Sequence, residues 1–291
     1  MYPKIQMRDI EVLLSVYMYR YLSGSQIKRL HFPSDQTAWR RIKVLLELGL
    51  IKAFTVPNIP ERIFYLDKKG ADIVAIELHE DIQDLEWHRH TRQPKDYYFL
   101  KHFIAINDFR ILITKACEAS DIKLVGFIPE YVGEQTKEGF VKKYIRDRIA
   151  DLAFSAVSYS HTPDAVFCLR KEDKAALFFL EIDRGLEVVN DPSKGFLKCA
   201  VFYLHYLIDK GYMRYEQDFG SVFSSIHTLI VTTSQPRLQH MREAVTAYPF
   251  PKDSVKRLLW GTLNSWLRID TMFNPIWQSM DTNDTTAYQI G

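Results

Sequence analysis

The chain has 291 residues, of which 47% are hydrophobic and 25% charged, enough to bury one large core or two smaller ones. No apolar run is long enough to cross a bilayer and the N-terminus lacks the apolar core of a signal peptide, so we expect a cytoplasmic protein without a membrane partner. Three widely spaced cysteines, Cys117, Cys168 and Cys199, lie in apolar surroundings, which predicts buried thiols and excludes a zinc-finger spacing.

Positive charge is concentrated in the first 70 residues, which hold 12 Lys and Arg against 6 Asp and Glu. The net charge of the whole chain is +2, so the rest of the chain is mildly acidic. This asymmetry predicts that a polyanion binds to the first module alone.

The hydrophobic spacing of this module predicts three helices, two strands and a further helix. They are expected at residues 8–20, 26–31, 35–48, 50–56, 62–66 and 67–78. Gly49 is expected to end the third helix, because glycine adopts the left-handed conformation that helix ends favour. This order is the layout of a winged helix-turn-helix domain, which we place at residues 1–78.

Exposed polar positions on the third helix and at the base of the wing are expected to contact double-stranded DNA. Arg and Lys can bind guanine edges or phosphates, and Gln can pair with adenine. The expected DNA-binding residues are Gln36, Thr37, Arg40, Arg41, Lys43 and Arg62. The alternative is a winged helix that contacts another protein, with Arg40 and Arg41 merely solvated.

The remainder of the chain divides into three segments. Residues 79–98 are polar and are expected to form a linker. Residues 99–270 alternate between helical and strand-like patterns, which predicts an α/β domain with a largely buried sheet. Residues 271–291 end without a core pattern and are expected to form a flexible tail.

Carboxylates at the ends of two neighbouring strand-like runs are the main candidate site. Asp164 precedes the run 165–169 and Glu181 follows the run 176–180, with a charged turn between them, which predicts a β-hairpin. Asp183 lies two residues after Glu181, on the same strand face. Three converging carboxylates can hold Mg²⁺, so we expect a metal site of Asp164, Glu181 and Asp183, as in a nuclease core.

A nuclease core of this kind would carry a lysine where the chain has Asp183. The missing cation is expected from Lys198 on the following helix, or from Arg184. The predicted catalytic residues are therefore Asp164, Glu181, Asp183 and Lys198. The alternative is a set of structural ion pairs, with Asp183 bonded to Arg184 and Glu181 bonded to Lys198.

The spacing of Pro163-Asp164-Ala165 and Glu181-Ile182-Asp183-Arg184-Gly185 resembles the PD-(D/E)XK nuclease-like fold. More narrowly, residues 8–266 resemble the replication-relaxation family of plasmid and mobile-element proteins. Further matching features are His102, Tyr203 and Val231-Thr232-Thr233-Ser234 followed by Arg237. The resemblance implies a winged helix followed by a restriction-endonuclease-like domain, and a role in plasmid replication or relaxosome-type mobilisation.

Three functions remain open at this point. The first is a DNA-binding protein of a mobile element, whose partners would be replication or relaxosome proteins or a second copy of the chain in a homodimer. The second is an active Mg²⁺-dependent endonuclease that nicks DNA near its binding site. The third is a transcriptional regulator whose α/β domain serves for dimerisation or sensing.

Overall fold

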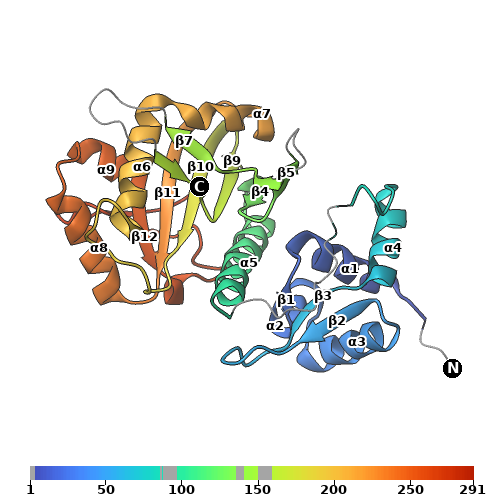
Figure 1. Ribbon diagram of the computed structural model, residues 1–291. Helices are drawn as coiled ribbons and strands as arrows, with labels where there is room; N and C mark the ends of the chain where they lie inside the picture. The colour runs from blue at the N-terminus through green and yellow to red at the C-terminus, as the bar shows by residue number, and fades with distance from the viewer. Residues whose placement is uncertain (1–3, 86, 88–96, 136–140, 150–158) are drawn as a thin grey trace. The chain divides into compact units, whose positions relative to one another are not determined.

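The computed structural model describes residues 4–85, 87, 97–135, 141–149 and 159–291 (Figure 1). The chain forms two compact units, Met1–Ile111 and Leu112–Gly291. The division falls inside α5 (Tyr97–Glu118), later in the chain than the linker predicted at residues 79–98. In the described part of the chain, no helix is both long and apolar enough to cross a membrane.

The first unit consists of helices around a small antiparallel sheet, in which the strand order is β1-β3-β2. Its elements are α1 (Met7–Tyr19), β1 (Leu22–Ser23), α2 (Gly24–His31), α3 (Asp35–Glu47), β2 (Ile51–Phe54), β3 (Ile63–Leu66), α4 (Lys68–Leu78) and most of α5. The three helices, the strand pair and the following helix predicted from the sequence are confirmed.

Local sequence signals set the ends of these helices. Ser23 and Gln26 form a capping box at the start of α2: Ser23 Oγ accepts from Gln26 N at 3.3 Å, and Gln26 Oε1 accepts from Ser23 N at 3.0 Å. Gly49 adopts φ +69° after α3, and Leu50 N donates to Leu45 O at 2.9 Å. This bond from the second residue beyond the cap closes the helix as the sequence predicted.

The second unit contains a larger mixed sheet with helices and two short strand pairs. Its elements after α5 are β4 (Lys123–Pro129), β5 (Gly133–Gln135), β6 (Val141–Lys143), β7 (Asp147–Ile149), β8 (Tyr159–His161), β9 (Ala165–Lys171), β10 (Lys174–Ile182), α6 (Gly195–Asp209), η1 (Gly211–Arg214), α7 (Tyr215–Phe219), β11 (Phe223–Thr232), α8 (Gln235–Ala247), α9 (Lys252–Leu258), β12 (Leu259–Leu263), η2 (Asn264–Trp266), β13 (Trp277–Ser279) and β14 (Ala287–Tyr288). The mixed α+β class predicted from the sequence is confirmed.

The described strands of this sheet follow the order β14-β13-β12-β11-β10-β9-β4. β4, β9 and β10 pair antiparallel, whereas β10, β11 and β12 run parallel. The parallel pairs need crossovers, which α6 and α7 supply between β10 and β11, and α8 and α9 supply between β11 and β12. In Figure 1, α6, α8 and α9 lie together beside the sheet.

Side chains alternate between the two faces of the sheet along β10. Phe179 packs against Tyr203 and Tyr206 of α6, with ring centroids 5.4 and 5.8 Å apart. On the other face, Phe178 stacks on Phe167 of β9 at 5.0 Å. The stacked rings continue across the sheet through β4, β9, β10, β11 and β12, and Tyr288 of β14 stacks on the last of them; the ladder consists of Phe127, Phe167, Phe178, His227, Trp260 and Tyr288.

The C-terminal segment differs from the flexible tail predicted at residues 271–291. It adds β13 and β14 to the edge of the sheet, and Trp277 and Met280 are fully buried. Arg242 of α8 also donates hydrogen bonds to the backbone oxygens of Ser279, Asp281 and Asp284, at 2.8, 3.0 and 2.9 Å. Strands of two and three residues are too short to show the alternation by which strands are recognised in a sequence.

Candidate functional sites

The predicted hairpin is β9 and β10, and it brings Asp164 and Glu181 to adjacent strand ends. Leu180 pairs with Ala165 in this hairpin, and Asp164 N donates to Leu180 O at 3.0 Å. Glu181 and Asp164 are therefore the next facing positions, on the same face as Phe179 and Val166. That face is the one covered by α6.

Asp164 is buried, with 9% of its surface exposed, and closes the end of the hairpin. Its Oδ2 accepts a hydrogen bond from Ile182 N at 2.6 Å. One carboxylate oxygen therefore satisfies a backbone donor where the strand pairing stops.

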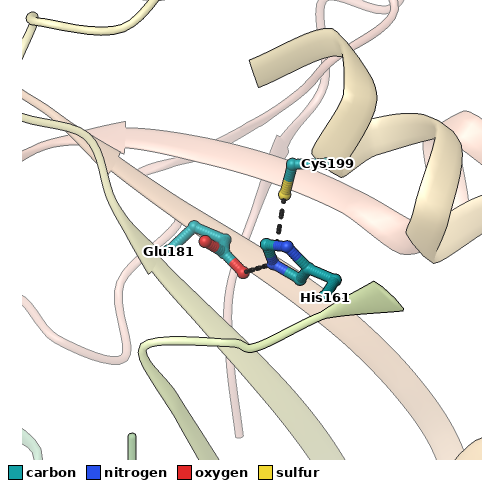
Figure 2. Close-up of side chains that lie close together, drawn as sticks. All are labelled: His161, Glu181 and Cys199. Atoms are coloured by element: carbon teal, nitrogen blue, oxygen red, sulfur yellow. Dashed lines mark hydrogen bonds and ion pairs between the residues drawn. The ribbon is translucent and has the colours of Figure 1, made fainter. Parts of the chain in front are cut away.

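Glu181 lies in a cluster with His161 of β8 and Cys199 of α6 (Figure 2), and Tyr203 of α6 joins the same cluster. Its Oε1 is 2.7 Å from His161 Nε2 and also accepts a hydrogen bond from the Tyr203 hydroxyl. The Cys199 thiol is 3.7 Å from the same His161 Nε2. Cys199 and Tyr203 are four residues apart on α6, so both point from one side of the helix toward β10.

Burial and the Glu181 carboxylate together set the protonation states of this cluster. Burial acts to lower the pKa of His161, but the adjacent Glu181 carboxylate outweighs it and the pKa is raised. Burial, reinforced by Glu181, raises the pKa of the Cys199 thiol and of the Tyr203 hydroxyl well above their usual ranges. Without a bound cation, Cys199 is a neutral thiol and Tyr203 a neutral donor.

Asp183 is bonded to a guanidinium. Arg237 of α8 contacts both of its carboxylate oxygens, with Nε 3.1 Å from Oδ2 and Nη2 2.9 Å from Oδ1. Thr232 Oγ1 donates to Oδ2 at 2.6 Å, and Gly185 N donates to Oδ1 at 3.1 Å. The two side chains of the pair are only 7% and 15% exposed.

Lys198, the predicted cation of this site, lies on α6 and is partly buried. Among the residues that the structure describes, it forms no hydrogen bond or ion pair with Asp164, Glu181 or Asp183. The structure thus brings Asp164 and Glu181 together and pairs Asp183 with Arg237, whereas in the described part of the chain Lys198 bonds to none of the three carboxylates.

The donors do not match a three-carboxylate Mg²⁺ centre. Magnesium prefers oxygen ligands in near-ideal octahedral geometry, whereas both oxygens of Asp183 are bonded to Arg237. The atoms gathered around Glu181 are instead an imidazole nitrogen, a thiol sulfur and a phenol oxygen. Sequence reasoning missed His161 and assigned Cys199 to the core, although the one-turn spacing of Cys199 and Tyr203 was a usable signal.

The predicted DNA-binding residues of the first unit divide into exposed and internally bonded groups. Gln36, Arg40 and Lys43 are exposed on α3. Arg41 instead forms an ion pair with the fully buried Asp9, with Nε 3.0 Å from Oδ1. Asp9 in turn accepts from Gln6 N at 2.7 Å at the start of α1, so Arg41 links α3 to α1.

Thr37 and Arg62 are the other two residues predicted to contact DNA. Thr37 N donates to the cap residue Ser34 at 3.3 Å, so Thr37 helps to start α3. Arg62 is exposed directly before β3, and its guanidinium carbon is 5.9 Å from the centre of the Phe64 ring. The exposed cations Arg40, Lys43 and Arg62 thus lie on α3 and at the end of the β2–β3 turn.

The chain matches the model of a known protein family. The family model described as replication-relaxation matches residues 13–198, well over half of the sequence. The chain belongs to the replication-relaxation family. The match covers α3, the β9–β10 hairpin and the start of α6, but ends before Cys199, Tyr203 and Arg237. Searches of curated proteins and of solved structures gave no match to the chain.

Proposed function

We propose that this replication-relaxation protein binds double-stranded DNA through its first unit and acts in the replication or mobilisation of a plasmid or other mobile element. Family membership supports the biological role. The main observation in support of DNA binding is the exposed face of α3, where Arg40 and Lys43 lie one helical turn apart. Cations on one face of a helix are the electrostatic footprint of a phosphate-binding surface.

The order of elements in the first unit supports a winged helix-turn-helix domain. α2 and α3 follow each other after a short break, and the β2–β3 hairpin comes directly after α3. In such domains the second helix of the pair enters the major groove, and here that helix is α3. Ser34, which caps α3, accepts from Thr37 N, and exposed N-terminal residues such as Gln36 follow it.

The strand pairing in the second unit supports a nuclease-like fold. The antiparallel strands β4, β9 and β10 are followed by the crossover helix α6 and the parallel strand β11, a mixed sheet of the kind expected for the α/β domain at residues 99–270. Mg²⁺-dependent nicking through three carboxylates has less support, because Asp183 is bonded to Arg237. We therefore propose strand binding or partner binding for this unit, with replication or relaxosome proteins as the partners.

The test is the salt dependence of DNA binding by the full-length protein. Arg40→Ala combined with Lys43→Ala is expected to weaken binding to a duplex and to reduce the slope of log K against log salt by about 2, roughly 1 for each lost phosphate contact. Arg41 stays unchanged in this variant, since its removal would leave Asp9 buried without its partner. Fluorescence anisotropy across a salt series measures both quantities.

The matched control removes the same charge from exposed positions of the second unit, Lys174→Ala with Arg268→Ala. We expect the control to retain the wild-type slope. If both double variants lose affinity equally, binding is a general charge effect and α3 is not the interface. If neither changes the slope, the first unit contacts a protein and not DNA.

A further inference from the structure

Three potential metal ligands from three separate elements meet beside the end of β10. His161 Nε2, Glu181 Oε1 and Cys199 Sγ all lie within 4.8 Å of one another. A tetrahedral ion with bonds of about 2.0–2.3 Å holds its ligand atoms roughly 3–4 Å apart. The observed separations of 2.7 Å between nitrogen and oxygen and 3.7 Å between sulfur and nitrogen need only small side-chain movements to reach that range.

The contacts distinguish a metal site from a nucleophilic triad. In a Cys-His-acid triad, the thiol and the carboxylate bond to opposite ring nitrogens, so that a proton taken at one side is balanced at the other. Here Glu181 and Cys199 both approach the same nitrogen, Nε2 of His161. One nitrogen cannot serve both partners in a relay, but ligands that share a cation converge in this way.

We infer that His161, Glu181 and Cys199 form a binding site for a divalent transition-metal ion of the Zn²⁺ type. Imidazole and thiolate are ligands that Zn²⁺ prefers, whereas Mg²⁺ and Ca²⁺ select oxygen. In the bound state Cys199 is a thiolate whose proton has passed to solvent, and Nε2 is the unprotonated nitrogen of a neutral His161 ring. Three protein ligands leave a fourth position for water or for a group of a bound partner.

The surrounding residues hold these ligands in place. Tyr203 donates to Glu181 Oε1, which orients the carboxylate. The His161 ring packs against Phe202 and Tyr203, with centroids 5.2 and 5.4 Å away. Such outer contacts fix ligand orientation, and their loss typically weakens metal binding by about 10–100-fold. The site uses residues of the second unit and the proposed DNA-binding face uses residues of the first, so the two proposals can fail independently.

The experiment loads the full-length protein, stripped of metal by a chelator, with Zn²⁺ or with Co²⁺ as a spectroscopic probe. We expect one metal ion per chain and a thiolate-to-Co²⁺ charge-transfer band. Cys199→Ser and His161→Gln should each weaken binding by about tenfold or more and remove this band or shift it. Cys117→Ser and His240→Gln are matched controls with the same substitutions outside the cluster, and they should bind as the wild type does.

Equal metal binding by the site variants and the controls would overturn the inference. So would a wild-type protein that takes up no metal, or a Co²⁺ complex without a thiolate band. If Cys199→Ser fails to fold, His161→Gln against its control His240→Gln still decides whether the metal binds at this cluster. DNA binding measured on the same samples shows whether the α3 proposal stands or falls separately.

Discussion

The two faces of the large sheet differ in the partners that they offer to ionisable side chains. On the α6 and α8 face, Glu181 and Asp183 are partly buried carboxylates, each with specific partners. On the opposite face, His227 stacks between Phe178 and Trp260, with centroids 5.5 and 4.0 Å away. One face therefore accepts charge because it supplies opposite charge and donors, whereas the stacked rings of the other favour an uncharged imidazole.

The polar face itself contains two kinds of partner. Asp183 is neutralised by a guanidinium, which keeps its charge at any ordinary pH. Glu181 is held by an imidazole and a phenol, and a thiol lies close to that imidazole. Imidazole and thiol can give up a proton in exchange for a metal ion. The Asp183–Arg237 pair therefore stabilises the fold, whereas the cluster around Glu181 is suited to binding a ligand.

Among the substitutions that test this comparison, Arg237→Ala is expected to change the free energy of unfolding most. It leaves the buried Asp183 carboxylate without its cation, which should lower the free energy of unfolding by about 3–5 kcal/mol. Urea unfolding measures the loss. Arg268→Ala, at an exposed position, is the control and should cost less than about 0.5 kcal/mol.

The double variant Asp183→Leu with Arg237→Met separates charge from packing. It removes both ions together, so stability should return toward that of the wild type. A single variant that unfolds like the Arg268→Ala control would show that Asp183 is solvated and available, and would return it to the set of possible metal ligands.

The hairpin with its acids was predictable because its signals are local. Two apolar β-prone runs flank a charged turn, and Asp164 and Glu181 lie at their ends. The helix ends at Ser23 and Gly49 were equally local. These features depend on a few neighbouring residues, so the sequence carries them directly.

The chemistry of the site was not predictable because its contacts join distant segments. Arg237 reaches Asp183 from 54 positions away, and His161 reaches Cys199 from 38 positions away. Neither pair leaves a periodic signal. The nearer basic residues, Arg184 and Lys198, were the natural expectation for Asp183 and Glu181, and only the placement of α8 and β8 reveals other partners.

The stability of the protein is expected to depend on pH through His227, on the sheet face that carries the stacked rings. Burial lowers the pKa of His227 to about 4, compared with about 6.5 in an unfolded chain. Between these values the unfolded state binds a proton that the folded state does not, so stability is full above about pH 6.5 and falls as pH decreases toward 4. The contribution of His227 to that loss is about 2–3 kcal/mol.

His227→Phe isolates this contribution, since other acids titrate over the same range in both proteins. The variant keeps a ring between Phe178 and Trp260 but loses the hydrogen bond from His227 Nδ1 to Arg257 O, which measures 2.8 Å. Unfolding free energies from pH 4.5 to 7.5 should fall less steeply with decreasing pH in the variant. Parallel curves would mean that the pKa of His227 is the same in the folded and the unfolded protein, so that this face of the sheet tolerates a charged imidazole.

The smallest effect is expected from Tyr203→Phe, which tests how Glu181 is held. The variant keeps the ring against Phe179 and His161 but removes the hydroxyl that donates to Glu181. Because His161 still contacts the carboxylate, the loss should be about 1 kcal/mol in metal-free protein, measured by urea unfolding. Tyr212→Phe, at a partly buried position in η1, is the matched control and should cost less than about 0.5 kcal/mol. Equal losses in the two variants would show that the phenol does not orient Glu181, leaving His161 as the group that fixes this carboxylate.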